Sequence, residues 1–246
     1  EKITKVVSAS NKNALKIISF LYSSIIDAGI HKASSIKVAE AAKVTENIQR
    51  DVNIALINEM HQLYSSIGIN TNEVIDAAAT KWNFMKLTPG MVGGHCISID
   101  PYYLMHKSEI SGYIPNIMRA SRKINDEMST WVLEKFLEFS NLKQVDINNT
   151  EITFLGYSFK ENCSDTRNTK VRDLIFLVKD YGVNIALWDP VVDPDELKHL
   201  EKEGIKIYTS TPSKIEFAFL CVNHDEINNF LKSFKGLVFD YKNIDF

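Results

Sequence analysis

Short apolar runs alternate with helix-like segments between residues 152 and 239 of this 246-residue chain. The alternation predicts a parallel sheet covered by helices, because one parallel strand reaches the next only through a crossover connection. Ligands of such sheets bind beyond the carboxyl ends of the strands, where residues 158–160 and Asp189 are expected. The predicted strands are 152–157, 184–188, 205–208, 217–222 and 237–239, and the predicted helices are 171–181, 196–203 and 227–234.

The residues before this sheet favour long helices. Apolar side chains recur every three to four residues from Ile36 to about Ile67, and Gly68 follows as the expected helix end. The fold class is therefore α/β, with a helical domain followed by a Rossmann-like parallel-sheet domain. Further predicted features are a short helix capped by Thr71 or Asn72, an irregular segment over 80–101, and a helix from Pro115 to about Phe139.

The chain changes character twice along its length. Residues 3–7 indicate a short strand and residues 13–22 a helix, which together are too few to form a domain. A polar stretch at 146–150 then separates the helical region from the sheet region. The predicted domains are a junction with a larger domain at 1–35, a helical domain at 36–140 and a sheet domain at 141–246.

Composition excludes several classes of function. The formal net charge is -3, and no basic excess favours nucleic acid or a membrane surface as a partner. The longest apolar stretches are far shorter than a membrane span. Three widely spaced cysteines argue against a disulfide framework and against a cysteine-based zinc site. We therefore expect no metal and a reducing, cytoplasmic location.

One cysteine lies in a glycine-rich run that suggests chemistry. Gly93 and Gly94 come just before Cys96, and Asp100 follows it four residues later. Glycines let a backbone approach a ligand closely, an exposed thiol can act as a nucleophile, and a nearby carboxylate can move protons. The alternative is a buried structural cysteine beside an ordinary turn.

Two further sets of polar residues are able to assist such a cysteine. Lys43 and Asn47 are four residues apart and share one face of the predicted helix. An ammonium group and an amide can stabilise a thiolate and an oxyanion, although a solvated helix face is the other interpretation. Lys160 and Arg167 follow the first strand of the sheet, where cations suit a phosphorylated ligand and ordinary surface charge is the alternative.

Three segments together resemble the UDP-glucose/GDP-mannose dehydrogenase family. They are 39–47 (AEAAKVTEN), 93–101 (GGHCISIDP) and 156–167, where GYSFK is followed by DTR. Residues 81–84 and 88–104 look most like the bacterial UDP-N-acetylglucosamine or UDP-N-acetylgalactosamine 6-dehydrogenases, which serve surface polysaccharide and capsule biosynthesis. The resemblance covers nearly the whole chain and implies a dimerisation role for the helical domain and UDP-sugar binding by the sheet domain.

The resemblance also implies a reaction and the residues that catalyse it. The C6 alcohol of the sugar would be oxidised to an aldehyde and then to a carboxylate. Cys96 would be the nucleophile, forming first a thiohemiacetal and then a thioester. Lys43 and Asn47 would hold the oxyanion, and Asp100 would assist proton transfer.

Binding roles follow from the same resemblance. Lys160, Phe84 and Gly93 would bind the UDP-sugar, and Arg167 would reach the cofactor, NAD. No G-x-G-x-x-G motif follows a strand in this sequence, and the family's further catalytic Thr and Glu have no counterpart. We therefore expect a fragment without the NAD-binding domain, inactive alone, which forms a homodimer through its central helices.

Two other functions remain open at this level. A cysteine hydrolase would pair Cys96 with His61, His95 or His106, and requires the two side chains to meet in space. Adjacent residues generally point apart, which favours a structural role for His95. A non-catalytic module for dimerisation or UDP-sugar binding is the third possibility.

Overall fold

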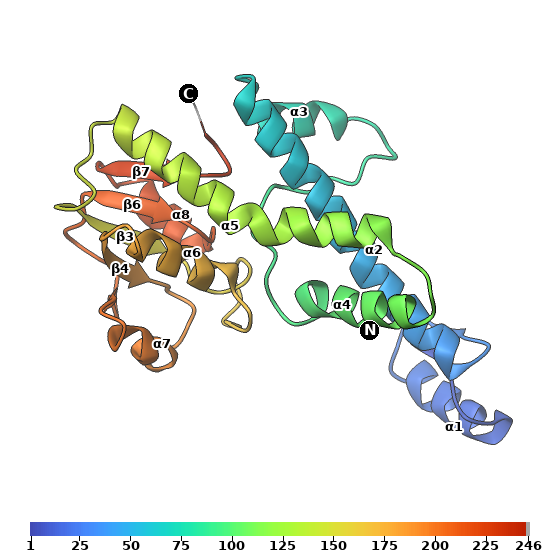
Figure 1. The fold of residues 1–246 in the computed structure, drawn as a ribbon. Coiled ribbons are helices and arrows are strands. Elements are labelled where there is room, and N and C mark those ends of the chain that lie inside the picture. The colour runs from blue at the N-terminus through green and yellow to red at the C-terminus, as the bar shows by residue number, and fades with distance from the viewer. Residues whose placement is uncertain (245–246) are drawn as a thin grey trace. The chain divides into compact units, whose positions relative to one another are not determined.

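The structure is a computed structural model that describes residues 1–244, and it divides the chain into two compact units, Glu1–Arg50 and Asp51–Phe246 (Figure 1). The helices are α1 (Lys12–Ser23), α2 (Ile36–Ser66), α3 (Thr71–Ala78), α4 (Cys96–Ile110), α5 (Asn116–Leu142), α6 (Lys170–Lys179), α7 (Pro194–Glu201) and α8 (Asp225–Leu231). The strands are β1 (Lys5–Val7), β2 (Ile30–Lys32), β3 (Glu151–Leu155), β4 (Asn184–Trp188), β5 (Lys206–Ile207), β6 (Phe217–Leu220) and β7 (Leu237–Asp240).

The first unit contains α1 and a small parallel pair of strands, β1 and β2. The Asn11 side-chain oxygen caps α1 by accepting a hydrogen bond from the Ala14 amide at 2.9 Å. The predicted strand at 3–7 and helix at 13–22 are both found, whereas β2 has too few apolar residues to be detected by pattern. Large apolar side chains of this unit are exposed, among them Ile3, Ile17, Phe20 and Ile25.

α2 is one uninterrupted helix of 31 residues, as its apolar spacing predicts. Beyond its end Gly68 adopts φ +70°, the left-handed conformation that commonly terminates a helix. The next helix, α3, is capped by Asn70 and not by the predicted Thr71 or Asn72. The Asn70 side-chain oxygen accepts hydrogen bonds from the amides of Asn72 and Glu73 at 2.9 and 3.3 Å, so the cap lies one or two residues earlier.

The start of α4 differs most from the sequence prediction. The sequence predicts an irregular segment over 80–101, but the irregular part ends near His95 and a helix begins at Cys96. This helix start has no side-chain cap, and Pro101 lies inside the helix, where proline is normally avoided. The sequence therefore offers no capping residue that would mark the start of this helix, and its proline argues against a helix here.

The second unit contains a five-stranded sheet, all parallel, in the order β5-β4-β3-β6-β7. The chain moves from β3 outward to β4 and β5, and then returns to the other side of β3 for β6 and β7. This doubly wound order has its topological switch point between β3 and β6. The predicted α/β fold with a parallel sheet is confirmed.

Helices cover both faces of this sheet. On one face Phe136 of α5 stacks on Phe219 of β6 and packs edge-on against Phe239 of β7. On the other face Trp188 of β4 meets Phe230, at the carboxyl end of α8. The sheet is consequently buried on both sides, as its continuous apolar strands predict.

α5 packs into the core of the sheet along its second half. Met128, Val132 and Phe136 are completely buried and belong to the same hydrophobic cluster as the strands. Figure 1 shows α5 beside α6 over the sheet, and the two helices are in contact. The end of the predicted helical domain therefore shares its core with the sheet, while the boundaries at 35/36 and 140/141 remain predictions.

Candidate active site

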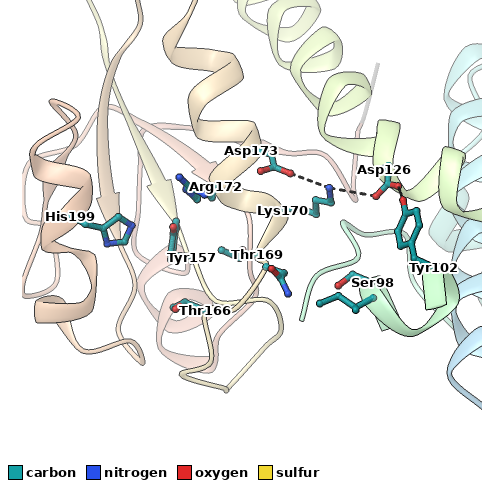
Figure 2. Close-up of a pocket in the computed structure, with 12 residues that line it drawn as sticks. Ser98, Tyr102, Asp126, Tyr157, Thr166, Thr169, Lys170, Arg172, Asp173 and His199 are labelled. Carbon is teal, nitrogen blue, oxygen red and sulfur yellow. Dashed lines mark hydrogen bonds and ion pairs between the residues drawn. The ribbon is translucent and has the colours of Figure 1, made fainter. Parts of the chain in front are cut away.

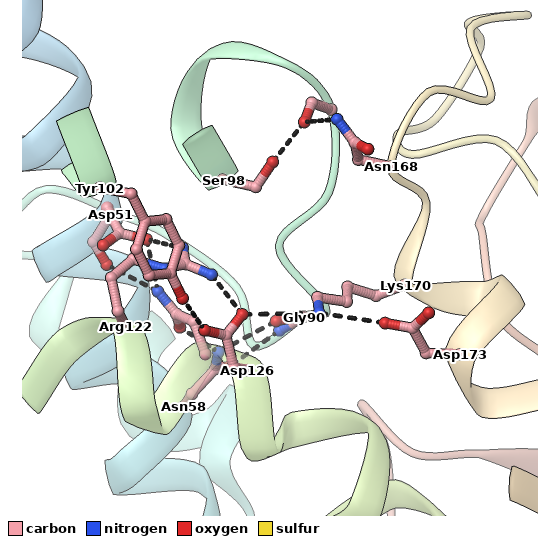
Figure 3. A network of polar contacts seen from close by, with 12 residues as sticks. Asp51, Asn58, Gly90, Ser98, Tyr102, Arg122, Asp126, Asn168, Lys170 and Asp173 are labelled. Carbon is pink, nitrogen blue, oxygen red and sulfur yellow. Dashed lines mark hydrogen bonds and ion pairs between the residues drawn. The ribbon is translucent and has the colours of Figure 1, made fainter. Parts of the chain in front are cut away.

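The turn before Cys96 is hydrogen-bonded to the loop that follows β3. The Gly94 amide donates to the Arg167 carbonyl at 3.1 Å, and the Asn168 side-chain amide donates to the Gly94 carbonyl at 3.3 Å. The Ser98 hydroxyl donates to the same carbonyl from the first turn of α4, as Figure 3 shows. Two motifs more than sixty residues apart in sequence thus form one local structure.

Glycine is required at this contact because there is no room for a side chain. A Cβ atom on Gly93 would lie 2.8 Å from the Asn168 carbonyl oxygen and 3.0 Å from the Phe159 Cβ. Gly94 adopts φ +82°, and a Cβ there would lie 3.0 Å from the Phe159 ring. The close approach at Gly93 is to the loop after β3, while the predicted approach to a ligand stays a prediction.

Cys96 is exposed and is the first residue of α4. The amide N–H groups of a first helical turn have no partners within the helix and favour negative charge nearby. Asp100 lies one turn further along, and residues spaced i and i+4 share a helix face. The helix thus places a thiol and a carboxylate beside each other, which the irregular segment predicted from sequence would not do.

Arg167 is exposed, and its guanidinium makes paired hydrogen bonds to the carboxylate of Asp165. These bonds lower the pKa of Asp165 to about 2. The hydrogen bonds with Asp165 and its negative charge in turn raise the pKa of Arg167.

Lys160 lies at the carboxyl end of β3, as predicted. Its side chain is exposed, with the ammonium nitrogen 5.6 Å from the centre of the Phe159 ring. Phe159 is also the residue against which Gly93 and Gly94 pack. The predicted phosphate-binding lysine and the cysteine turn are therefore joined through a single aromatic side chain.

The irregular segment from Lys81 to Gly94 is anchored near its middle by Asn58 of α2. The Asn58 side chain donates to the Gly90 carbonyl at 3.0 Å and accepts from the Gly90 amide at 2.9 Å. Asn58 is buried and also donates to Asn125 of α5 at 2.9 Å. Phe84, a predicted substrate contact, is half-buried on the same segment, and its contact with substrate remains a prediction.

An ionic network with a buried centre at Arg122 and Asp51 connects four helices close to this site (Figure 3). Arg122 of α5 lies 2.6 Å from Asp51 of α2 and 2.5 Å from Asp126, which also accepts from the Tyr102 hydroxyl of α4. Asp126 in turn lies 3.5 Å from the ammonium of Lys170, the first residue of α6. The sequence gives no signal for this network, because the spacing of its members follows no motif.

A cavity of about 600 Å³ opens between α4 and the start of α6 (Figure 2). None of the predicted site residues lines it, although its Ser98 and Ile99 closely follow Cys96. The sequence signal that could have found this place is a Thr-capped helix start with two cations, Thr169-Lys170-Val171-Arg172. The lining residues are Ser98, Ile99, Tyr102, Asp126, Tyr157, Thr166, Asn168, Thr169, Lys170, Arg172, Asp173 and His199.

Lys43 and Asn47 differ in environment although both lie on α2. Lys43 is exposed and forms an ion pair with Glu46 at 2.9 Å, as a solvated helix face would. Asn47 is only 1% exposed, which a solvated face does not explain. Both belong to the Glu1–Arg50 unit, and their action on Cys96 remains a prediction.

The histidines do not support a cysteine hydrolase. Both ring nitrogens of His61 are engaged, with Thr71 and with the Tyr241 carbonyl, each at 2.7 Å. His106 is ten residues after Cys96 on the same helix, about 15 Å along its axis. His95 is exposed and adjacent to Cys96, and makes no capping bond.

Groups of metal-ligating side chains, membrane-spanning helices and disulfides are absent from the part of the chain that the structure describes. Residues 1–244 contain no group of three or more His, Cys, Asp or Glu side chains arranged to hold a metal ion. Within the same residues, the helices are too short or too polar to cross a membrane. The three cysteines are free of disulfides.

Sequence comparison identifies the family. A profile of the central domain of the UDP-glucose/GDP-mannose dehydrogenase family matches residues 37–127, and a profile of that family's UDP binding domain matches residues 153–245. The chain belongs to this family and contains both of these domains.

Curated relatives are similar to nearly the whole of this chain. A UDP-N-acetyl-D-glucosamine 6-dehydrogenase from Pseudomonas aeruginosa is 44% identical over 228 residues, which are 92% of this chain and 54% of the relative. The enzyme of the same name from Salmonella typhi is 42% identical, over 91% of this chain and 52% of the relative. Protein CapL of Staphylococcus aureus is 43% identical, over 99% of this chain and 59% of the relative. The chain thus spans little more than half the length of these relatives.

Solved structures share the fold. A UDP-glucose dehydrogenase from Pyrobaculum islandicum has a TM-score of 0.85 at 19% identity, over 99% of this chain and 56% of that one. A UDP-D-ManNAc dehydrogenase from Pyrococcus horikoshii has a TM-score of 0.78 at 23% identity, over 96% of this chain and 55% of that one.

The glycine contact generates a prediction. Gly93→Ala places a methyl group against the backbone of residues 168–169, so we expect it to lower the free energy of unfolding by about 1–3 kcal/mol. Gly90→Ala is the matched control, since the nearest atom to its Cβ would be 3.9 Å away, and we expect a change within about 0.5 kcal/mol. Chemical denaturation of both variants measures the difference, and equal stabilities would refute the docked turn.

Proposed function

We propose that this chain is the central and C-terminal part of an NAD-dependent UDP-N-acetylhexosamine 6-dehydrogenase that serves surface polysaccharide biosynthesis. The observation that carries the proposal is the junction of the Cys96 turn with the Lys160 loop through Phe159. It supports a shared site, because the segment that carries Cys96 at a helix N-terminus packs against the residue that precedes Lys160. The names of the relatives from Pseudomonas aeruginosa and Salmonella typhi support the substrate class.

Binding of the UDP-sugar uses the carboxyl edge of the sheet. Lys160 is the exposed cation that follows β3, and it would pair with the diphosphate. The backbone at Gly93 and the half-buried ring of Phe84 would line the sugar-nucleotide beside it. The family's UDP binding domain matches the sheet region, which supports this arrangement.

Cys96 would then perform the covalent chemistry. Its sulfur adds to the C6 aldehyde and forms a C–S bond, and the resulting alkoxide is protonated to a thiohemiacetal. After a second oxidation the acyl group is held on the sulfur as a thioester, and water cleaves the C–S bond to give the carboxylate and the free thiol. Asp100 would accept the proton of that water, while Lys43 and Asn47 would stabilise the oxyanion.

NAD is the cofactor that the family resemblance implies, and when bound it supplies the hydride acceptor for both oxidations. The residue of this chain that fits it is Arg167, whose carbonyl accepts from the Gly94 amide in the turn before Cys96 and whose exposed guanidinium suits an anionic dinucleotide. The 246 residues contain no G-x-G-x-x-G motif, so we expect weak NAD binding and no catalysis by this chain alone.

The exposed apolar side chains support two further parts of the proposal. Leu56, Leu63 and Ile67 of the α2 region are about half exposed, which suits a homodimer through the central helices. The exposed apolar residues of the first unit suit its role as the edge of an NAD-binding domain. The whole enzyme would act in the cytoplasm, in keeping with three free thiols.

Lys160→Ala tests substrate binding. We expect calorimetric titration of this chain with UDP to show affinity at least about tenfold weaker in the variant, because a charge-assisted hydrogen bond to the diphosphate is lost. Lys235→Ala is the control, since Lys235 is exposed just before β7 and therefore lies at the amino ends of the strands, away from their carboxyl ends. Absence of UDP binding by the unchanged chain, or equal affinities of the two variants, would contradict the proposal.

Cys96→Ser tests the nucleophile in a longer chain that also carries the NAD-binding domain. We expect formation of the uronic acid to fall by about three orders of magnitude or more, because hydroxyl is a far poorer nucleophile than thiolate. Cys163→Ser is the matched control, since that half-buried thiol comes four residues before Arg167 in the same loop, and it should keep the rate within about twofold. Continued acid formation by Cys96→Ser would show that Cys96 is not the nucleophile.

A further inference from the structure

Two buried polar side chains lie beneath the loop that carries Lys160. Asp189 directly follows β4, and His224 comes shortly after β6. Asp189 is 4% exposed and His224 is fully buried. The proposed reaction uses neither of them. Burying a carboxylate and an imidazole costs free energy unless both are hydrogen-bonded, so their partners show what they do.

Asp189 holds the chain where it leaves two neighbouring strands. Its Oδ2 accepts from the amides of Tyr157 and Ser158 at 2.6 and 3.1 Å, just beyond β3. Its Oδ1 accepts from the amides of Val191 and Val192 at 2.9 and 3.0 Å, just beyond β4. Burial opposes the charge, but these bonds and the one from His224 outweigh it and lower the pKa of Asp189 to about 2.

His224 holds both ends of the segment 158–162. Its Nδ1 accepts from the Asn162 amide at 2.9 Å, and because an amide only donates, the ring proton lies on Nε2. Nε2 is 3.2 Å from both the Asp189 Oδ2 and the Ser158 hydroxyl. That hydroxyl donates onward to the Lys160 carbonyl at 2.9 Å, so one imidazole fixes the backbone on both sides of the lysine.

These three side chains do not form a nucleophilic triad. Ser158 is fully buried, and its proton is donated to the Lys160 carbonyl, away from the histidine. A serine nucleophile would have to be exposed and to donate to the imidazole. The arrangement is instead a support for the loop.

The same loop contacts the turn before Cys96. Phe159 lies between Ser158 and Lys160, and its ring and Cβ are the atoms that Gly93 and Gly94 meet. The Phe159 amide donates to the Asp165 carbonyl at 3.1 Å, which continues the contact toward Arg167. A displacement of the segment would therefore move Lys160 and release the glycine turn together.

We propose that His224, held by Asp189, is a positioning residue that fixes the 158–162 loop so that Lys160 and the Gly93–Gly94 turn face the same UDP-sugar. The effect on Lys160 rests on the proposed function, whereas the effect on the glycine turn does not. Two readouts can therefore separate the two proposals.

The test compares His224→Phe and His224→Gln with Leu200→Ala, which removes a fully buried side chain of α7 in the same core. Backbone amide exchange is measured at Gly94, Phe159 and Asn162, and UDP affinity by calorimetry. For His224→Phe we expect at least tenfold faster exchange at these amides and at least tenfold weaker UDP binding. Gln keeps a donor toward Asp189 and Ser158, so His224→Gln should fall between this variant and the unchanged chain.

Leu200→Ala should lose thermal stability while keeping UDP affinity and exchange at the three amides. Unchanged exchange in His224→Phe would overturn the positioning role, and faster exchange with unchanged UDP affinity would overturn its link to the ligand. Failure of the unchanged chain to bind UDP would refute the proposed function, while the exchange data would still decide the positioning role. If His224→Phe does not fold, Ser158→Ala takes its place, because it removes only the bridging hydroxyl. For this variant we expect about threefold faster amide exchange and about threefold weaker UDP binding, and the same outcomes would overturn the proposal.

Discussion

The packing of Gly93 and Gly94 against Phe159 is the contact on which the candidate site depends. It requires the absence of two side chains on one segment and the presence of an aromatic ring on another. Through it, the helix start that carries Cys96 is held against the end of β3 and the cation that follows it. The contact thus connects the segment that carries the thiol to the loop that carries the lysine.

Buried polar groups support this contact from two sides. Asp189 and His224 hold the β3 loop from beneath the sheet edge, while Arg122 and Asp126 connect α5 to α4 and, through Lys170, to α6. Such networks add little net stability compared with apolar packing, but breaking one partner leaves a buried charge unpaired. They therefore favour one arrangement of loops over its alternatives, as a site with several polar groups requires.

The sequence predicted the elements whose signals are local. Apolar periodicity identified α2 and all five strands of the sheet, whereas ligand binding by the loop after β3 stays a prediction. It did not predict α4, because that helix lacks a capping side chain and contains Pro101. Nor did it predict the roles of Asn58 and His224, since their side-chain partners all lie more than thirty residues away and no spacing rule connects them.

The most direct test of the central claim is whether a UDP-sugar that binds Lys160 also covers Cys96. The measurement is the rate of Cys96 alkylation by iodoacetamide at increasing concentrations of UDP-N-acetylglucosamine, followed by mass spectrometry of the modified peptide. The account predicts that the sugar nucleotide slows alkylation at least fivefold, with half-protection at the calorimetric Kd, and that AMP gives no protection. Alkylation at an unchanged rate under saturating sugar nucleotide would contradict it.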